Sequence, residues 1–173
     1  MDNSRRDFIR NTALVVAGTA LVSSNDLFAA PKKIERVGLQ LYSVRDAMDK
    51  DPAGSLKKLA DMGYVHVEHA NYVNRKFYGY TAKEFKKLLS GMDLQMHSGH
   101  TVMTAHDWDD AKNDFTDKWK YTVEDAAEVG QRYVISPWLD EGLRHDPDKL
   151  KKTMDQCNKC GELCKKYNMK FGY

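Results

Sequence analysis

Five short apolar segments, separated by stretches with helical periodicity, constrain the fold of this chain more than any other feature. The extended segments begin near Val37, Tyr64, Leu94, Arg132 and Met169. Regular alternation of strands with helices predicts parallel strands that are joined by right-handed crossovers. The chain is therefore predicted to be an α/β protein.

The first extended segment, residues 37–44, has an aliphatic face and a polar face because its apolar and polar residues alternate. This pattern is typical of a barrel strand whose aliphatic face lies under a helix and whose polar face lines a pocket. A flavodoxin-like open sheet would also have five strands. However, the turn at Ser43–Asp46 contains no glycine-rich phosphate loop, so the sequence favours the barrel.

Capping residues mark the predicted helices. Asp51-Pro52 and Asp146-Pro147 each place a capping carboxylate before a proline that suits the first helical position. Thr81 and Glu84 have the spacing of a capping box. A long helix is predicted from Trp108 to Val129, because apolar residues recur there at steps of three and four.

The composition indicates an ordinary globular domain. Of the 173 residues, 42% are hydrophobic and 30% are charged, which suffices for one core. The formal net charge is only +2 and the two signs are interspersed, so nothing favours a nucleic-acid partner.

The N-terminal residues 1–30 resemble a twin-arginine export signal. Ser4-Arg5-Arg6-Asp7-Phe8-Ile9 is close to that consensus, and the apolar run Ala13–Val22 follows it. This run is too short to span a bilayer, so no stable membrane anchor is predicted. An amphipathic N-terminal helix is the alternative. The signal implies export to the periplasm, and it divides the chain into a signal peptide, residues 1–30, and a folded domain, residues 31–173.

From about residue 34 onward, the chain resembles the sugar phosphate isomerase/epimerase family of xylose isomerase-like (β/α)8 barrels. The resemblance rests on the order of six motifs. They are Val37–Asp46, Gly63–Glu68, Phe77–Thr81, Ser98–His100, Tyr133–Leu139 and Lys170–Tyr173.

The resemblance covers only half of such a barrel. The family has eight βα units, whereas this chain supplies four units and the start of strand five, so it is interpreted as the N-terminal half. In the complete family barrel, two Glu, one Asp and one His on strands five to eight hold a divalent metal, commonly Mn, Mg, Co or Zn. Those ligands lie beyond the matched part. The resemblance therefore implies a sugar or sugar phosphate as partner, no metal on this chain, and a chain that is inactive by itself.

Four residues at predicted strand ends are candidates for binding the sugar, because sites in such barrels lie at the carboxyl ends of the strands. Glu68 matches a family residue that accepts hydroxyl hydrogen bonds, although a salt bridge to a loop is an equal alternative. His100 matches the family histidine of strand three. Strict alternation favours His97 instead, unless the strand is bulged. The other two candidates are Tyr42 and Trp138; Trp138 would offer either an apolar platform for a sugar or packing at the barrel rim.

Cys157, Cys160 and Cys164 have a spacing that would suit zinc or an iron–sulfur cluster. Helical periodicity favours another interpretation, in which Cys157 and Cys164 are small core residues.

Three hypotheses follow: an exported isomerase or epimerase-like protein, a non-catalytic periplasmic carbohydrate-binding or interaction module, and a cysteine-ligated metal protein. A half-barrel would also expose strand edges at strands one and four, which predicts self-association.

Overall fold

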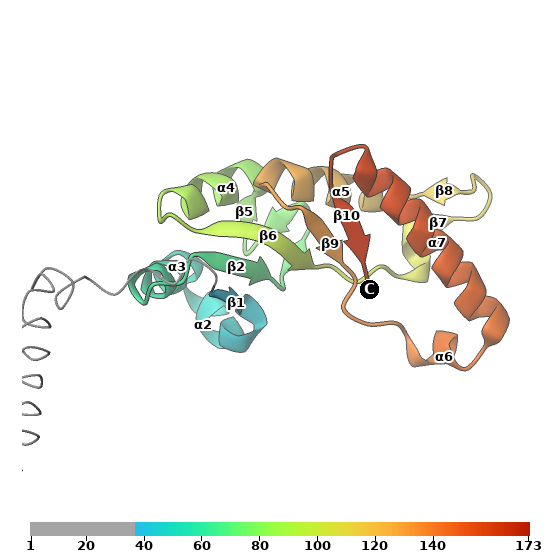
Figure 1. The fold of residues 1–173 in the computed structure, drawn as a ribbon, viewed down its shortest axis with the longest axis horizontal. Helices are drawn as coiled ribbons and strands as arrows, with labels where there is room; N and C mark the ends of the chain where they lie inside the picture. The colour runs from blue at the N-terminus through green and yellow to red at the C-terminus, as the bar shows by residue number, and fades with distance from the viewer. Residues whose placement is uncertain (1–36) are drawn as a thin grey trace, which may run out of the picture. The chain divides into compact units, whose positions relative to one another are not determined.

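The five predicted strands form one parallel sheet. The computed structural model of the chain describes residues 37–173, so the signal peptide predicted for residues 1–30 lies outside the described residues. The strand order, β1-β2-β6-β9-β10, follows the order of the chain (Figure 1). A flavodoxin-like sheet would instead reverse its order at a switch point. The strands are β1 (Gly38–Gln40), β2 (His66–His69), β6 (Gln95–His100), β9 (Tyr133–Ile135) and β10 (Lys170–Gly172).

The barrel is half-built and open. In the described part of the chain, β1 and β10 lie at the two ends of the sheet order and do not pair with each other. The open edges are therefore β1 and β10. The prediction of an open edge at strand four was wrong, because β10 pairs in parallel with β9 and covers it.

The helices begin where their capping residues predict. The Asp51 carboxylate accepts a hydrogen bond from the Gly54 amide, and the Thr81–Glu84 capping box is complete. Asp146 accepts from the two amides at the start of the last helix. Each cap contributes about 1 kcal/mol to helix stability. The helices are α2 (Arg45–Lys50), α3 (Pro52–Asp61), α4 (Ala82–Ser90), α5 (Asp117–Val129), α6 (Glu141–Arg144) and α7 (Pro147–Lys165).

Two hydrophobic clusters stabilise the sheet. The first joins β1 and β2 to α3 and α4, with Leu56 and Phe85 fully buried. The second joins β9 and β10 to α5 and α7, with Trp119 and Val123 at its centre. Burying one such side chain contributes roughly 1.5–3 kcal/mol. Because these clusters lie on the helix side, the opposite face of the sheet keeps its polar residues free to line the barrel interior.

The first strand is shorter than predicted. The extended backbone ends at Gln40, and a 3₁₀ turn, Leu41–Val44, leads directly into α2. Leu41 is fully buried in this turn. The sequence alternates past the end of the strand because Leu41 is buried in the 3₁₀ turn, just as it would be in a longer strand.

The long helix predicted from Trp108 was wrong in its first part. A 3₁₀ turn, Ala105–Asp107, precedes two paired strands, β7 (Trp108–Asp109) and β8 (Asp114–Phe115), and α5 starts only at Asp117. The Asp109 carboxylate accepts hydrogen bonds from two backbone amides in the connecting turn. Short acidic side chains compete for backbone donors in this way and disfavour a helix interior.

An antiparallel hairpin unit between β2 and α4 was not predicted. It comprises β3 (Tyr72–Val73), β4 (Lys76–Phe77) and β5 (Tyr80–Thr81). The two residues of its first turn, Asn74 and Arg75, both have positive φ, as a type I′ hairpin turn requires.

The core positions of the cysteines agree with the prediction in part. Cys160 and Cys164 are fully buried on α7, whereas Cys157 is half-buried. The Trp119 indole N–H donates to the Cys160 sulfur at 3.2 Å. The prediction is confirmed for Cys164. Cys157 only packs against the cluster, and Cys160 is the second fully buried cysteine in place of Cys157.

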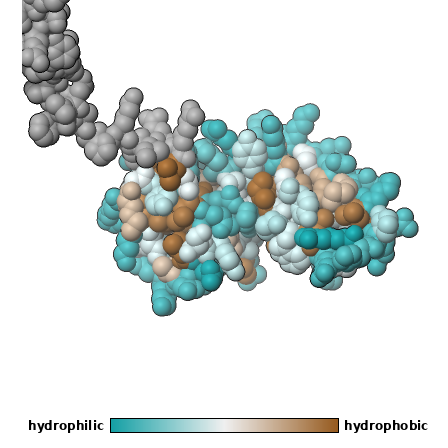
Figure 2. Space-filling view, turned by 60° about the horizontal axis from the view of Figure 1, so that its bottom comes forward, coloured by the Kyte–Doolittle hydropathy of each residue, from teal (hydrophilic) through white to brown (hydrophobic). Residues whose placement is uncertain are grey.

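The surface is mixed in character. On the face drawn in Figure 2, hydrophobic residues form separate patches among hydrophilic ones. In the range 37–173, no helix is long and apolar enough to cross a membrane.

Candidate functional site

A hydrogen-bonded network of polar side chains lies at the carboxyl ends of β1, β2 and β6. The Gln40 amide donates to His100 Nδ1 at 2.8 Å, and His100 Nε2 lies 2.5 Å from Glu68 Oε1. The Ser98 hydroxyl donates to the other carboxylate oxygen of Glu68 at 2.7 Å. Because the amide nitrogen can only donate, His100 carries its proton on Nε2 and presents it to Glu68. The network therefore fixes the tautomer of His100 and the orientation of the Glu68 carboxylate.

A β-bulge brings His100 into this network. Glu68 lies in register with Ser98, whereas two residues earlier His66 lies in register with Gln95, so β6 contains one extra residue between these pairs. The bulge resolves the choice between His97 and His100. His100 lies beside Glu68, and His97 packs against His66 with ring centroids 4.9 Å apart.

Both His66 and His97 leave a buried Nδ1 atom without a hydrogen-bond partner. Burial lowers the pKa of His97, and the nearby Arg132 and His66 lower it further. This pair of imidazoles lies on the interior side of the sheet, because His66 precedes Glu68 on β2 and His97 precedes His100 on β6.

His69 lies on the other side of the sheet, beneath the network. Its ring is 1% exposed and contacts Phe77 edge-on, with centroids 4.8 Å apart. The ring occupies the space that a side chain at Gly99 would need, since an added Cβ there would lie 1.9 Å from two of its atoms. Gly99 directly precedes His100, so the buried imidazole supports the backbone that carries the network.

Burial lowers the pKa of His69 to about 3, with a smaller contribution from His100. The unfolded chain would take up this proton near the ordinary pKa of 6.5. Stability from the neutral imidazole is therefore fully present above pH 6.5 and is lost as the pH falls toward 3. For a single group the loss approaches about 1.4 kcal/mol per pH unit.

We expect a His69→Leu variant to lose less stability than the wild-type protein between pH 7 and pH 5. Urea unfolding gives the free energy of unfolding of each protein at both pH values. From pH 7 to pH 5, the wild type should lose roughly 2 kcal/mol more than the variant. His145→Leu, at an exposed position, is the control and should follow the wild-type slope. Parallel pH profiles for the wild type and His69→Leu would contradict the assignment.

The two predicted aromatic candidates lie apart from the network. Tyr42 is 57% exposed on the 3₁₀ turn after β1, and the Arg45 guanidinium covers its ring at 4.7 Å. Trp138 is 48% exposed in the loop after β9. Of the four predicted site residues, the structure thus brings Glu68 and His100 into contact and leaves Tyr42 and Trp138 at the rim. Their roles in binding a sugar remain predictions.

Sequence reasoning did not single out Gln40 and Ser98 as site residues. Gln40 belongs to the polar face of the first strand, and that pattern was the available signal. Strict alternation places Ser98 on the same face as His100 but assigns both to the face opposite His97, so only the bulge before Ser98 brings the two side chains to Glu68.

The network does not form a metal site by itself. Between residues 37 and 173, no three His, Cys, Asp or Glu side chains are grouped so that they could hold a metal ion. Glu68 and His100 also satisfy each other, so the two groups that could ligate a cation are already hydrogen-bonded. The metal predicted for the complete family barrel would need ligands from outside this network.

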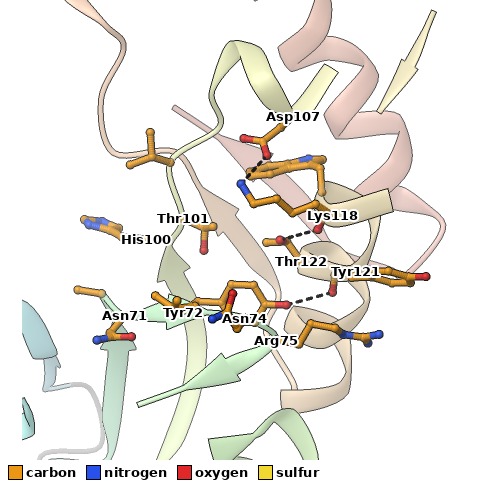
Figure 3. A pocket seen from close by; sticks show the side chains of 14 residues that line it. Asn71, Tyr72, Asn74, Arg75, His100, Thr101, Asp107, Lys118, Tyr121 and Thr122 are labelled. Carbon is orange, nitrogen blue, oxygen red and sulfur yellow. Dashed lines mark hydrogen bonds and ion pairs between the residues drawn. The ribbon is translucent and has the colours of Figure 1, made fainter. Parts of the chain in front are cut away.

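A cavity of about 770 Å³ adjoins the network at the carboxyl ends of β2 and β6 (Figure 3). It lies between the β3–β4 hairpin and α5, and His100 forms part of its wall. The hairpin is held on α5 by Asp125. This carboxylate accepts the Tyr72 hydroxyl at 2.6 Å and two guanidinium N–H groups of Arg75 at 2.8 and 3.0 Å. Burial and this hydrogen bond raise the pKa of Tyr72, so its hydroxyl stays a donor.

The fold resembles solved structures of sugar isomerases and epimerases. A sugar phosphate isomerase/epimerase from Parabacteroides distasonis superimposes with a TM-score of 0.71 at 24% identity, over 88% of this chain and 55% of that chain. A second one from the same organism gives a TM-score of 0.66 at 28% identity, over 79% and 53%. A D-psicose 3-epimerase structure gives 0.51 at 12% identity, over 69% and 45%. The chain spans about half the length of these proteins.

No curated protein sequence matches this chain. A family model described as the xylose isomerase-like TIM barrel matches residues 56–173, which is more than half of the chain. The parallel sheet in sequential order, its open edges and this match agree: the chain belongs to the xylose isomerase-like TIM barrel family.

Proposed function

We propose that this chain binds a sugar or sugar phosphate at the carboxyl ends of its strands and forms the sugar-binding part of an isomerase or epimerase site. The observation that carries the proposal is the network of Gln40, Glu68, Ser98 and His100. Three neighbouring parallel strands present it at the end of the sheet where barrel enzymes bind substrate. The family membership supports the same reaction class.

The network suits hydroxyl groups. The Glu68 carboxylate has lone pairs beyond the two used by Ser98 and His100, so it can accept a sugar hydroxyl proton. His100 is about a third exposed and Glu68 about a quarter, so a ligand can reach both side chains. Since Gln40 holds the His100 ring, the binding groups are oriented before the sugar arrives, which reduces the entropic cost of binding.

Sugar binding should depend on this network. We expect Glu68→Gln and His100→Ala each to weaken binding of a hexose at least about tenfold, the loss typical of one charge-assisted hydrogen bond. Titration of the full chain by isothermal calorimetry or saturation-transfer NMR measures the effect. Glu162→Gln, an exposed change on α7, is the matched control and should bind like the wild type. Equal affinities of Glu68→Gln and the wild type for the hexose would contradict the proposal.

The chain by itself is proposed to be inactive, because the described residues do not group three metal ligands. Incubation with Mn²⁺ and a panel of aldo- and keto-sugars should give no interconversion. Turnover would refute this part of the proposal and would imply that two chains assemble a site.

The proposal includes export to the periplasm, which the twin-arginine-like residues Arg5 and Arg6 support.

The second candidate is a non-catalytic periplasmic carbohydrate-binding or interaction module. The exposed rings of Trp138 and Tyr173 favour it, because aromatic faces at a rim are suited to stack on sugars. The downstream DNA separates the two candidates. An in-frame continuation that encodes His, Glu and Asp ligands would support the isomerase and eliminate the module.

A further inference from the structure

We propose that the cavity between the β3–β4 hairpin and α5 binds a second ring of the substrate, so that the ligand is an uncharged saccharide of disaccharide size. This inference rests on the proposed sugar site at Glu68 and His100. It extends that site outward rather than replacing it.

The cavity is continuous with the network through His100. The ring nitrogens of His100 are engaged by Gln40 and Glu68, and the same residue forms part of the cavity wall. A ligand that contacts Glu68 and His100 could therefore reach the cavity by extending over the carboxyl ends of β2 and β6. At about 770 Å³, the cavity falls in the range of roughly 300–1,000 Å³ that encloses drug-sized molecules. It is larger than one six-membered ring requires.

The cavity wall combines groups that recognise hydroxyls with aromatic rings. Asn71, Asn74 and Thr101 contribute amide and hydroxyl groups, and their side chains appear in Figure 3. Tyr72 and Tyr121 contribute aromatic surface. Amides donate and accept hydrogen bonds at once, as sugar hydroxyls do, and aromatic rings cover the apolar faces of sugars.

The charges of the cavity are balanced, which favours a neutral ligand over a phosphorylated one. Lys118 pairs with the buried Asp107 carboxylate at 3.0 Å, and Arg75 pairs with Asp125. An anionic group would have to compete with these carboxylates for the two cations. A phosphate site would instead leave its cations unpaired and converging on one point.

The hairpin that forms one wall is a fixed part of the fold. Arg75 has a φ of 61°, a conformation that costs a residue other than glycine roughly 1–2 kcal/mol. Its two hydrogen bonds to Asp125 and the stacking of its guanidinium on Tyr121, at 4.3 Å, hold the turn against α5. The cavity is therefore formed before a ligand binds.

The test compares ligands of different size and charge on the full chain. Calorimetric titrations with glucose, galactose, maltose, cellobiose, lactose and glucose 6-phosphate should show at least one disaccharide binding about tenfold or more tightly than its component monosaccharide. Thr101→Trp, which fills the cavity, should reduce the disaccharide affinity to that of the monosaccharide. Asn71→Ala should reduce it in the same direction. Gln95→Ala, at the opposite end of β6, is the control, and circular dichroism confirms that each variant is folded.

The outcomes separate this inference from the proposed function. If monosaccharides bind through Glu68 but no disaccharide binds more tightly, the cavity inference fails and the sugar site stands. Tighter binding of glucose 6-phosphate than of every disaccharide also overturns the inference. Absence of binding for every sugar tested overturns both proposals. A disaccharide gain that survives Thr101→Trp shows that the second ring lies elsewhere and overturns the inference.

Discussion

Replacing Gly99 with alanine should lower the free energy of unfolding by about 3 kcal/mol or more, the upper end of the cost of overpacking. The added Cβ would lie 1.9 Å from the His69 ring and 2.8 Å from the Gln131 amide nitrogen. His69 and Gln131 are 1% and 5% exposed, so neither side chain can easily move into solvent. Urea denaturation followed by circular dichroism measures the loss.

Gly161→Ala is the matched control for this prediction. Nothing lies within 4 Å of the Cβ that alanine would add at this helical position. It should raise stability by about 0.5–1 kcal/mol, because glycine is a poor residue in a helix interior.

A second test combines Gly99→Ala with His69→Ala. If the clash with His69 is the cause, the double variant should lose less than the sum of the single losses. Strict additivity would show that the strain at Gly99 has another source.

The full chain should self-associate at micromolar concentration in sedimentation velocity experiments. Both sheet edges, β1 and β10, are open in the described structure, and open edges are templates for pairing with another chain. Within residues 37–173, no helix or strand covers the interior face either. Val134 packs against the helices, so the alternation of the strand directs its neighbour Tyr133 to the interior side, where it is 42% exposed.

A charge on the interior face should reverse this association. Tyr133→Lys should shift the distribution toward monomer, because burying an unpaired ammonium between two copies is costly. Tyr167→Lys is the control, since Tyr167 is similarly exposed, at 38%, but its hydroxyl lies 3.3 Å from Glu124 of α5. A monodisperse wild-type monomer would contradict the prediction. An equal shift from both variants would show that the interior face is not the contact.

Local chemistry explains what was predicted correctly. The helix starts at Asp51-Pro52, Thr81 and Asp146-Pro147 depend on side chains that cap amides two or three residues away. Such bonds need no distant partner, so they can be read from neighbouring residues. The alternation of strands and helices likewise predicted the parallel sheet and its sequential order.

Errors arose where one local pattern was compatible with two different structures. The apolar spacing from Trp108 to Phe115 fits a helix, but the Asp109 carboxylate caps a turn between them instead, and the two rings meet edge-on at 5.0 Å. On α7, helical phase alone could not decide between Cys157 and Cys160. The position of Trp119 on α5 decided it, because the indole N–H reaches only the Cys160 sulfur.

The sequence by itself determined the five parallel strands, their order and the capped helix starts, because these depend on periodicity and on caps within a few residues. Only the tertiary structure decided that His100 rather than His97 meets Glu68, since one extra residue in β6 reverses the face of every later side chain. It also decided the cavity beside them, whose walls come from a hairpin and a helix about fifty residues apart. Contacts between such distant segments depend on how the chain packs, and no local pattern encodes them.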